Sequence, residues 1–194
     1  HKNSVAPIQE IANVLLLGGH IGREGAGLCP VRGHSNVQGD RTVGINHNPS
    51  IEFLDSLNNE FGIYVPEESG LDAVDSVKQM NKGGASIFVS MGGNFLSAMS
   101  DTKATAEGLQ KCSLTAHIST KPNRSHLVTG RTSIILPCLG RTELDITGGG
   151  TQFVTVENSM GVVHRSIGKR KPASEHLLSE CAIVAGLAIA IDDV

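Results

Sequence analysis

The chain has 194 residues, 39% of them hydrophobic, which is enough to bury an ordinary core in one domain or in one domain with an appendage. Its net charge of −3, with Lys and Arg scattered, argues against nucleic acid as a partner. The 23 glycines, against five Phe, one Tyr and no Trp, indicate tight turns and not an aromatic binding platform. No apolar run could span a bilayer and no signal peptide appears, so we expect no membrane insertion and a cytoplasmic location.

The cysteines stand far apart, at Cys29, Cys112, Cys138 and Cys181, and match neither a CxxC motif nor a zinc-finger spacing. This spacing favours incidental thiols in a reducing compartment, and we predict no metal ligand among them. The first residue is His and a helical pattern begins almost at once, so we expect the chain to be cut from a longer one.

Helices are predicted in the first part of the chain. Apolar residues at helical spacing predict a helix over residues 5–16 that stops at Gly18 and Gly19. A second predicted helix begins with Asn48 as its N-cap and ends at residue 61, and a third covers about 71–80. Between the first two lies a polar stretch, residues 28–45, which has no apolar period and which we predict to be a long loop.

Strands are predicted after residue 83, where the apolar period changes. Short β-branched runs at 86–90, 114–118 and 133–137, with a helical stretch near 104–109, predict βαβ units and a parallel sheet. A later strand is expected within 151–159. The other expectations here are a hinge-like tract at 148–150 and a closing helix capped by Ser174.

The loops after the first two predicted strands would meet at the carboxyl edge of the sheet, where ligands bind in such folds. Gly92 and Gly93 follow the first strand, where they could bring backbone N–H groups to an anion or form an ordinary tight turn. The standard glycine-rich fingerprints of NAD and ATP sites are absent. The histidines His34, His117, His126 and His164 could be acids, bases or ligands, but isolated histidines are more often structural or at the surface.

One long motif is specific. The stretch "GGHIGREGAGLCPVRGHSNVQGDRTVGI" resembles a segment of the catalytic subunits of molybdopterin oxidoreductases, the dimethyl-sulfoxide-reductase superfamily, and is nearest to the formate-dehydrogenase-like branch. These enzymes carry G-x-x-G-x-x-G-x-G followed by P-V-R-G-x-x-N-V-Q-G. The similarity continues in order through "MGGN", "STKPNRSH", "IILPCLGRTE" and "VTVENSMGVV", and so covers nearly the whole chain.

The resemblance implies a Rossmann-like three-layer α/β/α fold with a mostly parallel sheet, preceded by helical segments of an adjoining domain. Residues 1–80 would end that preceding α/β domain and carry an active-site loop at 19–45. Residues 81–194 would form part of the domain that binds molybdopterin guanine dinucleotide. The alternative from a different class is a non-catalytic nucleotide-binding or structural α/β module.

The implied cofactor of the parent subunit is a bis-molybdopterin guanine dinucleotide carrying Mo or W, with a 4Fe-4S cluster possible elsewhere in that subunit. The implied reaction is a two-electron oxidation or reduction of a small-molecule substrate. The implied partners are the remaining domains of the same subunit and an electron-transfer protein. This chain has no residue that matches the metal ligand of the family, so we expect it to be inactive alone.

By the resemblance, Arg32 would face the metal and orient an anionic substrate, a role suited to a permanently charged, forked donor. The other reading of Arg32 is a bridge between helix ends. Cofactor contacts are implied at Gly33, Asn36, Gln38, Gly92, Gly93, Asn94, His117, Ser119, Thr120 and Asn158. The chain departs from the family at Gly93, Phe95 and Ile118, where relatives carry an acid, a proline and often an aspartate, so the partner of the guanine edge stays open.

Overall fold

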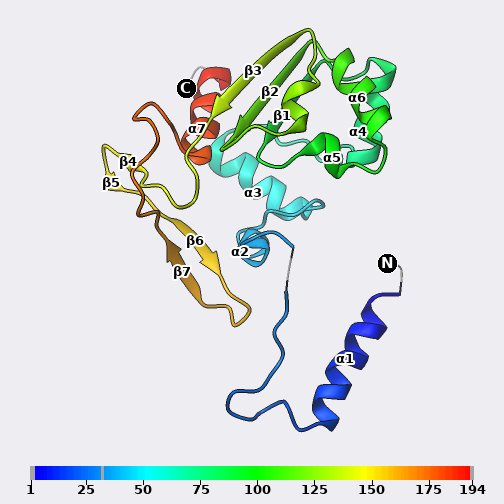
Figure 1. Cartoon of the computed structure of the whole chain (residues 1–194), viewed down its shortest axis with the longest axis vertical. Helices are drawn as coiled ribbons and strands as arrows, with labels where there is room; N and C mark the ends of the chain where they lie inside the picture. Colours follow the sequence, from blue (N-terminus) through cyan, green and yellow to red (C-terminus); the bar gives the residue numbers. More distant parts are fainter. Residues whose placement is uncertain (1–2, 32, 193–194) are drawn as a thin grey trace.

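The computed structural model describes residues 3–31 and 33–192 and contains a three-stranded parallel sheet, which lies at the top of Figure 1. The strands lie side by side in chain order: β1 (Ile87–Met91), β2 (Leu114–Ser119) and β3 (Thr132–Pro137). Their β-branched and aromatic side chains fit a pleated backbone. The Rossmann-like α/β fold is confirmed, as is the expectation that the loops after β1 and β2 open at one edge of the sheet.

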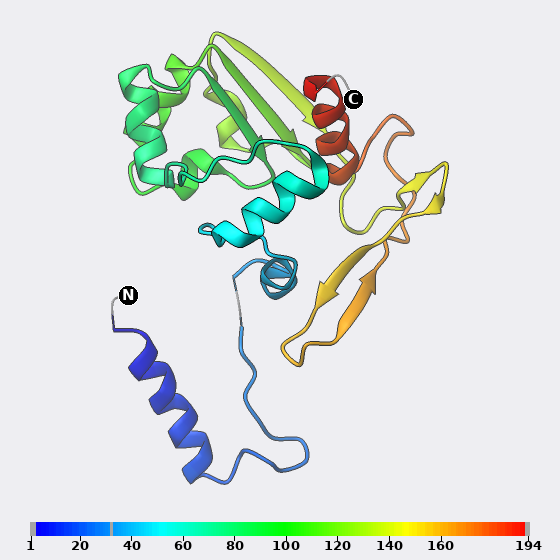
Figure 2. The same cartoon turned by 180° about the vertical axis from the view of Figure 1, so that it is seen from behind.

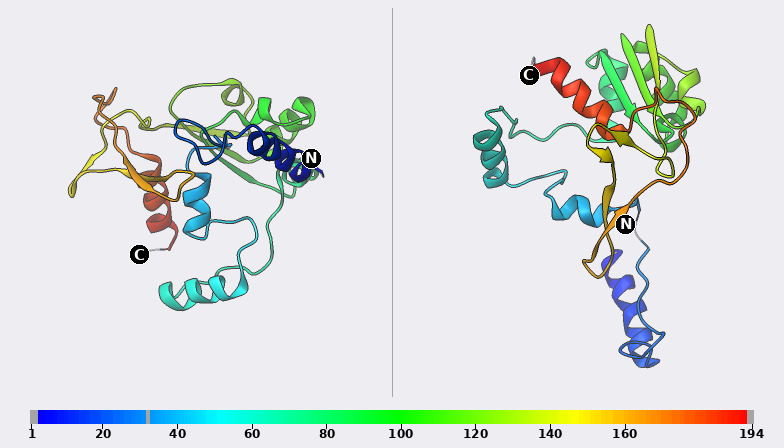
Figure 3. Two further views of the ribbon diagram at one scale, coloured as in Figure 1. Left: turned by 90° about the horizontal axis from the view of Figure 1, so that it is seen from below. Right: turned by 90° about the vertical axis from the view of Figure 1, so that its left-hand side faces the viewer.

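Helices cover one face of this sheet (Figure 3). They are α4 (Ala73–Lys82), α5 (Phe95–Ala98), α6 (Thr102–Lys111) and the 3-10 helix η1 (Arg124–Leu127). The buried core between the helices and the sheet contains Met80, Leu96, Leu109 and Cys112. A Cβ on Gly108 would lie 3.0 Å from the Met80 Cβ, so the glycine lets α6 approach α4 closely.

The opposite face of the sheet is apolar but open to solvent. Ile87 is 62% exposed, Val89 56% and Ile134 44%. The last two are in register with Ala116 of β2, so they form one row across the sheet. Parallel sheets are normally covered on both faces. Among the described residues, the second helical layer of the expected α/β/α arrangement does not cover this row.

The amino-terminal part is extended. Helix α1 (Val5–Leu17) stands apart from the sheet in both views of Figures 1 and 2, and its apolar side chains are largely exposed. The surface area of the described chain is 14455 Å². A compact protein of this mass would expose about 8,800 Å². Much apolar surface is therefore free to meet other polypeptide. None of the helices in the described ranges is both long and apolar enough to cross a membrane.

Three boundaries differ from the expected ones. Residues 28–45 are not all loop, because α2 (Val37–Thr42) forms within them. Helix α3 (Ile51–Phe61) is capped by Ser50 and not by Asn48, since the Ser50 hydroxyl accepts the Phe53 N–H at 3.3 Å. The N-cap is the residue directly before the first helical residue, and a side-chain oxygen there can accept a backbone N–H of the first turn.

The closing helix α7 (Glu180–Asp192) begins five residues later than a helix capped by Ser174 would. Ser174 does not cap it, because its hydroxyl accepts the His176 N–H at 3.2 Å within a turn. Ser179 takes the capping role by accepting the Ala182 N–H at 3.4 Å. The Leu178 carbonyl also accepts the Leu139 N–H at 2.9 Å, which places the start of α7 beside the end of β3 (Figures 1 and 2).

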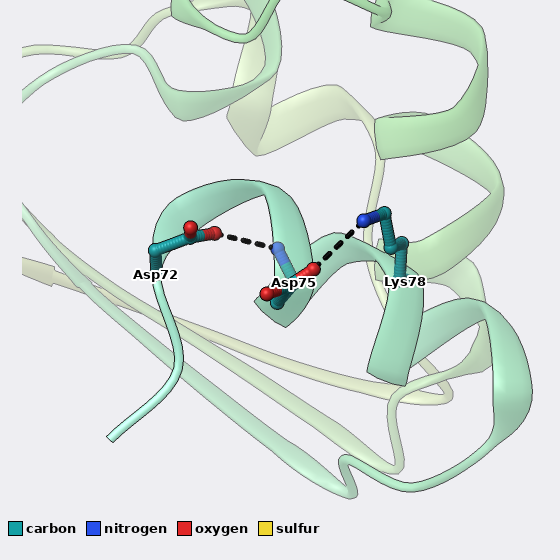
Figure 4. A network of polar contacts seen from close by, with 3 residues as sticks. All are labelled: Asp72, Asp75 and Lys78. Carbon is teal, nitrogen blue, oxygen red and sulfur yellow. Dashed lines mark hydrogen bonds and ion pairs between the residues drawn. The ribbon is translucent and has the colours of Figure 1, made fainter. Parts of the chain in front are cut away.

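Helix α4 shows how short polar side chains set a helix start (Figure 4). The Asp72 carboxylate accepts the Asp75 N–H at 2.8 Å as the N-cap, and Lys78 bonds Asp75 one turn later at 2.8 Å. The hydrogen bond to Asp75 raises the pKa of the Lys78 ammonium. Both side chains are exposed, so this pair serves the local helix and adds little stability in water.

Two antiparallel hairpins extend from the sheet. β4 (Ile146–Thr147) and β5 (Gly150–Thr151) are joined by a two-glycine turn, so the tract expected to be a hinge is a hairpin turn. β6 (Val154–Glu157) confirms a strand within 151–159 and pairs with β7 (Val163–Ser166). The proposed division at residue 80 stays a prediction, and α4, which spans it, packs against α6.

Candidate functional site

The segment 28–45 is held against the β6–β7 hairpin through α2. The Asn36 Oδ1 accepts the backbone N–H of Glu157 at 2.8 Å, and the Gln38 Nε2 donates to the Glu157 carboxylate at 2.9 Å. Helix α2 contacts β6 along this line. The structure therefore brings together two residues that were predicted to bind cofactor. The side chain of each, however, forms a hydrogen bond with Glu157. Arg32, the predicted catalytic residue, lies outside the described residues.

Two cavities open around this contact. The smaller, of about 330 Å³, is lined by Gly33, Asn36, Gln38 and Asn158 among others. The larger, of about 630 Å³, has Asn36 and Arg141 on its wall. Asn36 thus lies between the two. Four of the residues assigned to the cofactor by resemblance meet at the smaller cavity, although they come from segments about 120 residues apart.

Asn158 faces this site with its amide already engaged. Its Oδ1 accepts the N–H groups of Met160 at 2.9 Å and Val162 at 3.1 Å, and its Nδ2 lies 2.9 Å from the His164 Nε2. These bonds close the turn between β6 and β7. The geometry supports Asn158 as the residue that shapes the hairpin, and a bound ligand would have to compete for its side chain.

Glu143 is a residue of the larger cavity that pattern reasoning missed. Its carboxylate accepts the Gly140 N–H at 2.6 Å and the Ala173 N–H at 3.1 Å. The chain from 168 to 173 crosses directly over it: a Cβ on Gly168 would overlap the Glu143 backbone. The "GRTE" stretch just after β3 carries this carboxylate, but nothing in the stretch points to the loop that crosses there. Glu143 fixes the loop that carries Arg141.

Arg141 is the cation of the larger cavity. Its guanidinium reaches the Ser166 hydroxyl only at 3.4 and 3.5 Å, the limit of hydrogen-bond length. Carboxylates stand on the same wall, at Asp40, Glu143, Asp145 and Glu180. The cavity thus offers one strong donor for an anionic oxygen and several acceptors for ring N–H groups.

The second group of predicted residues lies at the carboxyl edge of β1 and β2. Gly92 and Gly93 both have left-handed backbones, with φ of 63° and 65°, which explains two consecutive glycines. The Gly92 N–H donates to the Ile118 carbonyl at 2.8 Å. Asn94 caps α5 and its Oδ1 accepts the Ser125 hydroxyl at 2.9 Å. Gly92 and Asn94 therefore link the loop after β1 to the segment after β2, and the two glycines form a tight turn.

The link between the loops continues through η1. Asn123 donates from its Nδ2 to the Gly93 carbonyl at 2.7 Å and accepts the Ser125 N–H at 2.9 Å. Ser119 donates its hydroxyl to the Lys121 carbonyl at 2.8 Å, and Thr120 is exposed beside it. The surface left for a ligand at this edge is therefore that of Gly93, Ser119 and Thr120, with the half-buried Asn94 next to Gly93.

His117 does not face that surface. It is 2% exposed, and its ring lies 5.9 Å from Phe88 and 4.8 Å from His126 between centroids. Burial lowers the pKa of His117 below its ordinary value, and the charge on His126 lowers it further. The side chain belongs to the core beneath the loops, because alternate residues of β2 point to opposite faces of the sheet. Contact with a cofactor stays a prediction that would need this layer to open.

Neither of these two cavities is lined by residues of the second group, and the β6–β7 hairpin lies away from β1 and β2 (Figure 1). Within residues 3–31 and 33–192, no cluster of three or more His, Cys, Asp or Glu side chains could hold a metal ion. Burial raises the pKa of the Cys112 and Cys138 thiols, and nearby Glu180 and Glu143 raise that of Cys138 further. Both thiols are therefore poor nucleophiles.

The chain is similar over almost its whole length to parts of longer bacterial proteins. It is 52% identical over 191 residues to "Uncharacterized oxidoreductase Rv2900c" of Mycobacterium tuberculosis, covering 98% of this chain and 24% of that protein. It is 50% identical over 188 residues to "Protein YdeP" of Escherichia coli, covering 97% of this chain and 25% of that protein. No family model matches the chain. The chain therefore spans about a quarter of the length of these curated relatives, one of which is named an oxidoreductase.

Proposed function

We propose that this chain is part of an oxidoreductase of the molybdopterin type, related to formate dehydrogenases, and that it supplies one active-site loop and part of the cofactor site. Two lines support the proposal. Relatives at about half identity include proteins named oxidoreductases. The "CPVRGHSNVQG" motif resembles the substrate-facing loop of the molybdopterin enzymes.

The observation that carries the proposal is the contact of α2 with β6. Through it, the motif-bearing segment closes on the β6–β7 hairpin and forms the walls of two cavities, of about 330 and 630 Å³. Cavities of this size, with a few convergent polar groups, are typical of cofactor and small-molecule sites.

The groups on the cavity walls fit a pyrophosphate-bearing pterin. The Arg141 guanidinium suits a phosphate oxygen, and carboxylates such as Asp145 suit the N–H donors of a pterin ring. The Ser35 hydroxyl adds a donor between the cavities. When bound, the metal cofactor supplies the two-electron transfer. Arg32 would hold an anionic substrate by charge-assisted hydrogen bonds in a site that excludes water.

The carboxyl edge of the sheet is proposed to hold one guanosine of the cofactor at Gly93, Asn94, Ser119 and Thr120. Titration of the ¹⁵N-labelled chain with GDP tests this part. We expect backbone amide shifts at these four residues and weak binding, with a dissociation constant of about a millimolar, since half a site forgoes much of the contact energy. ADP is the matched control, because it keeps the pyrophosphate and lacks the guanine N1 and N2 donors. Equal shifts with ADP, or none with millimolar GDP, would remove the guanosine assignment.

A further inference from the structure

Asn36 has an unusual backbone and an unusual bond. It is the only described non-glycine residue with a positive φ, at 63°, a conformation that Asn tolerates better than most residues. It stands at the N-cap of α2 yet makes no side-chain bond to its own helix. An Asn at this position normally caps the first turn. Here its Oδ1 instead accepts the Glu157 N–H, 121 residues away.

Gln38 bonds the same residue with its own amide. Its Nε2 donates to the Glu157 Oε1 at 2.9 Å in a half-buried position. A hydrogen bond to a carboxylate is about twice as strong as one between neutral groups. Glu157 thus holds α2 at two points, with its backbone N–H on Asn36 and its side chain on Gln38.

Gly39 is explained by this arrangement. Its φ is ordinary, so the turn itself does not require glycine. A Cβ at position 39, however, would overlap the Asn36 side-chain oxygen and crowd the rest of that amide. The glycine leaves room for the Asn36 side chain to lie across α2 toward Glu157. Asn36, Gln38 and Gly39 therefore serve one contact, which we call the α2–β6 contact.

Glu157 is presented from a fixed position. It is the last residue of β6 and pairs with Val163 of β7. The next residue, Asn158, closes the hairpin turn with its own amide. The carboxylate therefore stands on a paired strand beside a closed turn, and its partner α2 lies within the segment 28–45. A contact residue on a paired strand fixes its partner more accurately than a contact residue on a loop would.

We propose that Glu157 is a positioning residue for the segment 28–45, and that Asn36 and Gln38 place this segment instead of contacting the cofactor. This inference rests on the proposed function and gives it a geometry, because the bond made at residue 36 holds α2 directly after the segment that contains Gly33. The contact joins atoms of the chain itself, so it can be tested whether or not the chain binds a pterin.

The first test is Gly39→Ala in the chain, followed by amide hydrogen exchange. Alanine favours a helix over glycine, so a purely local effect would slow the exchange of the α2 amides. The α2–β6 contact predicts the opposite: the Asn36 side chain must move, and exchange across residues 36–43 becomes roughly tenfold faster. Gly186→Ala in α7 is the matched control, since a Cβ there meets nothing within 4 Å. Slower exchange in α2 of the Gly39→Ala chain would overturn the proposal.

The second test separates the bonds from the fold. Glu157→Ala should return the Gln38 side-chain amide signals to their solvent positions and speed exchange in residues 36–43 by roughly tenfold, with the β1–β3 sheet unchanged. Glu157→Gln keeps an acceptor oxygen and should restore most of the protection. Unmoved Gln38 signals in Glu157→Ala, or no rescue by Glu157→Gln, would overturn the assignment of Glu157. Neither readout depends on GDP, so a loss of the α2–β6 contact is distinguished from a failure of the guanosine assignment.

Discussion

The rings of His117 and His126 lie 4.8 Å apart between their centroids, and within the described part of the chain the Nε2 of each is buried without a hydrogen-bond partner. The His126 Nδ1 accepts the Asn123 N–H at 2.8 Å, which completes the cap of η1. On His117, the register neighbours in β1 and β3 are Ser90 and Ile135, which carry no charge. Buried polar atoms of this kind are rare and costly.

Stability should therefore fall as the pH is lowered through the range where His117 titrates. Burial lowers its pKa in the folded chain, so below about pH 6.5 the unfolded chain binds a proton that the folded chain does not. This contribution is complete above pH 6.5 and is lost as the pH falls toward the lowered value. Melting temperatures at pH 5.5 and 7.5 should differ more for the wild-type chain than for His117→Gln. The exposed His47→Gln is the control, and equal pH dependence in all three chains would refute the account.

Gly168→Ala should destabilise the loop crossing at Glu143. The new Cβ would overlap the Glu143 backbone, so the two segments must separate and the carboxylate loses the Ala173 N–H. We expect a cost of about 1–3 kcal/mol in the free energy of unfolding. Gly148→Ala is the matched control, since its Cβ would meet nothing within 4 Å. Urea denaturation of both variants measures the difference, and equal midpoints would show that the crossing is loose.

The two faces of the sheet should respond oppositely to charge. Val89→Lys puts an ammonium on the open face, where the side chain is already 56% exposed, and should leave the melting temperature within a few degrees while reducing self-association. Phe88→Lys, one residue away, puts the same charge into the helix-covered core beside Phe95 and should unfold the chain. Circular dichroism melts and sedimentation velocity measure both. Unfolding by Val89→Lys would mean that this face is covered in solution.

The sequence predicts the regular elements well and the site less well. Strands and the helices α1, α3 and α4 follow from the period of their apolar residues, with ends displaced where a nearer hydroxyl takes the cap, as Ser50 does. Helix α2 was missed because "VQGDRT" has no apolar period. Its place depends on Glu157, whose bonds to Asn36 and Gln38 span about 120 residues and leave no local pattern.

The sequence left open whether His117 is structural or contacts a ligand, and it gave no role to Glu143, for similar reasons. A histidine at the end of a strand looks the same in sequence whether it faces a ligand or the core. Only the packing of Phe88 and His126 decides between these positions. The partners of Glu143 are backbone N–H groups, and because every residue type except proline has one, the sequence does not identify them.

Arg32→Lys, introduced into a full-length enzyme that contains this segment, should separate cofactor binding from substrate handling. Lysine keeps the charge but loses the forked donor set, so metal content should stay and kcat/KM should fall by the equivalent of about 2–4 kcal/mol. Steady-state kinetics with metal analysis on the same preparation give both numbers. A variant with unchanged kinetics, or one that loses the metal, would count against a substrate-facing arginine.

The most direct measurement is the metal and nucleotide content of a full-length protein that contains this chain, purified from a host that makes the cofactor. The account predicts stoichiometric molybdenum or tungsten, and GMP released with the pterin on acid hydrolysis. A pure, folded protein with neither metal nor GMP would contradict the account and would favour a nucleotide-binding or structural module that has kept the fold without the redox chemistry.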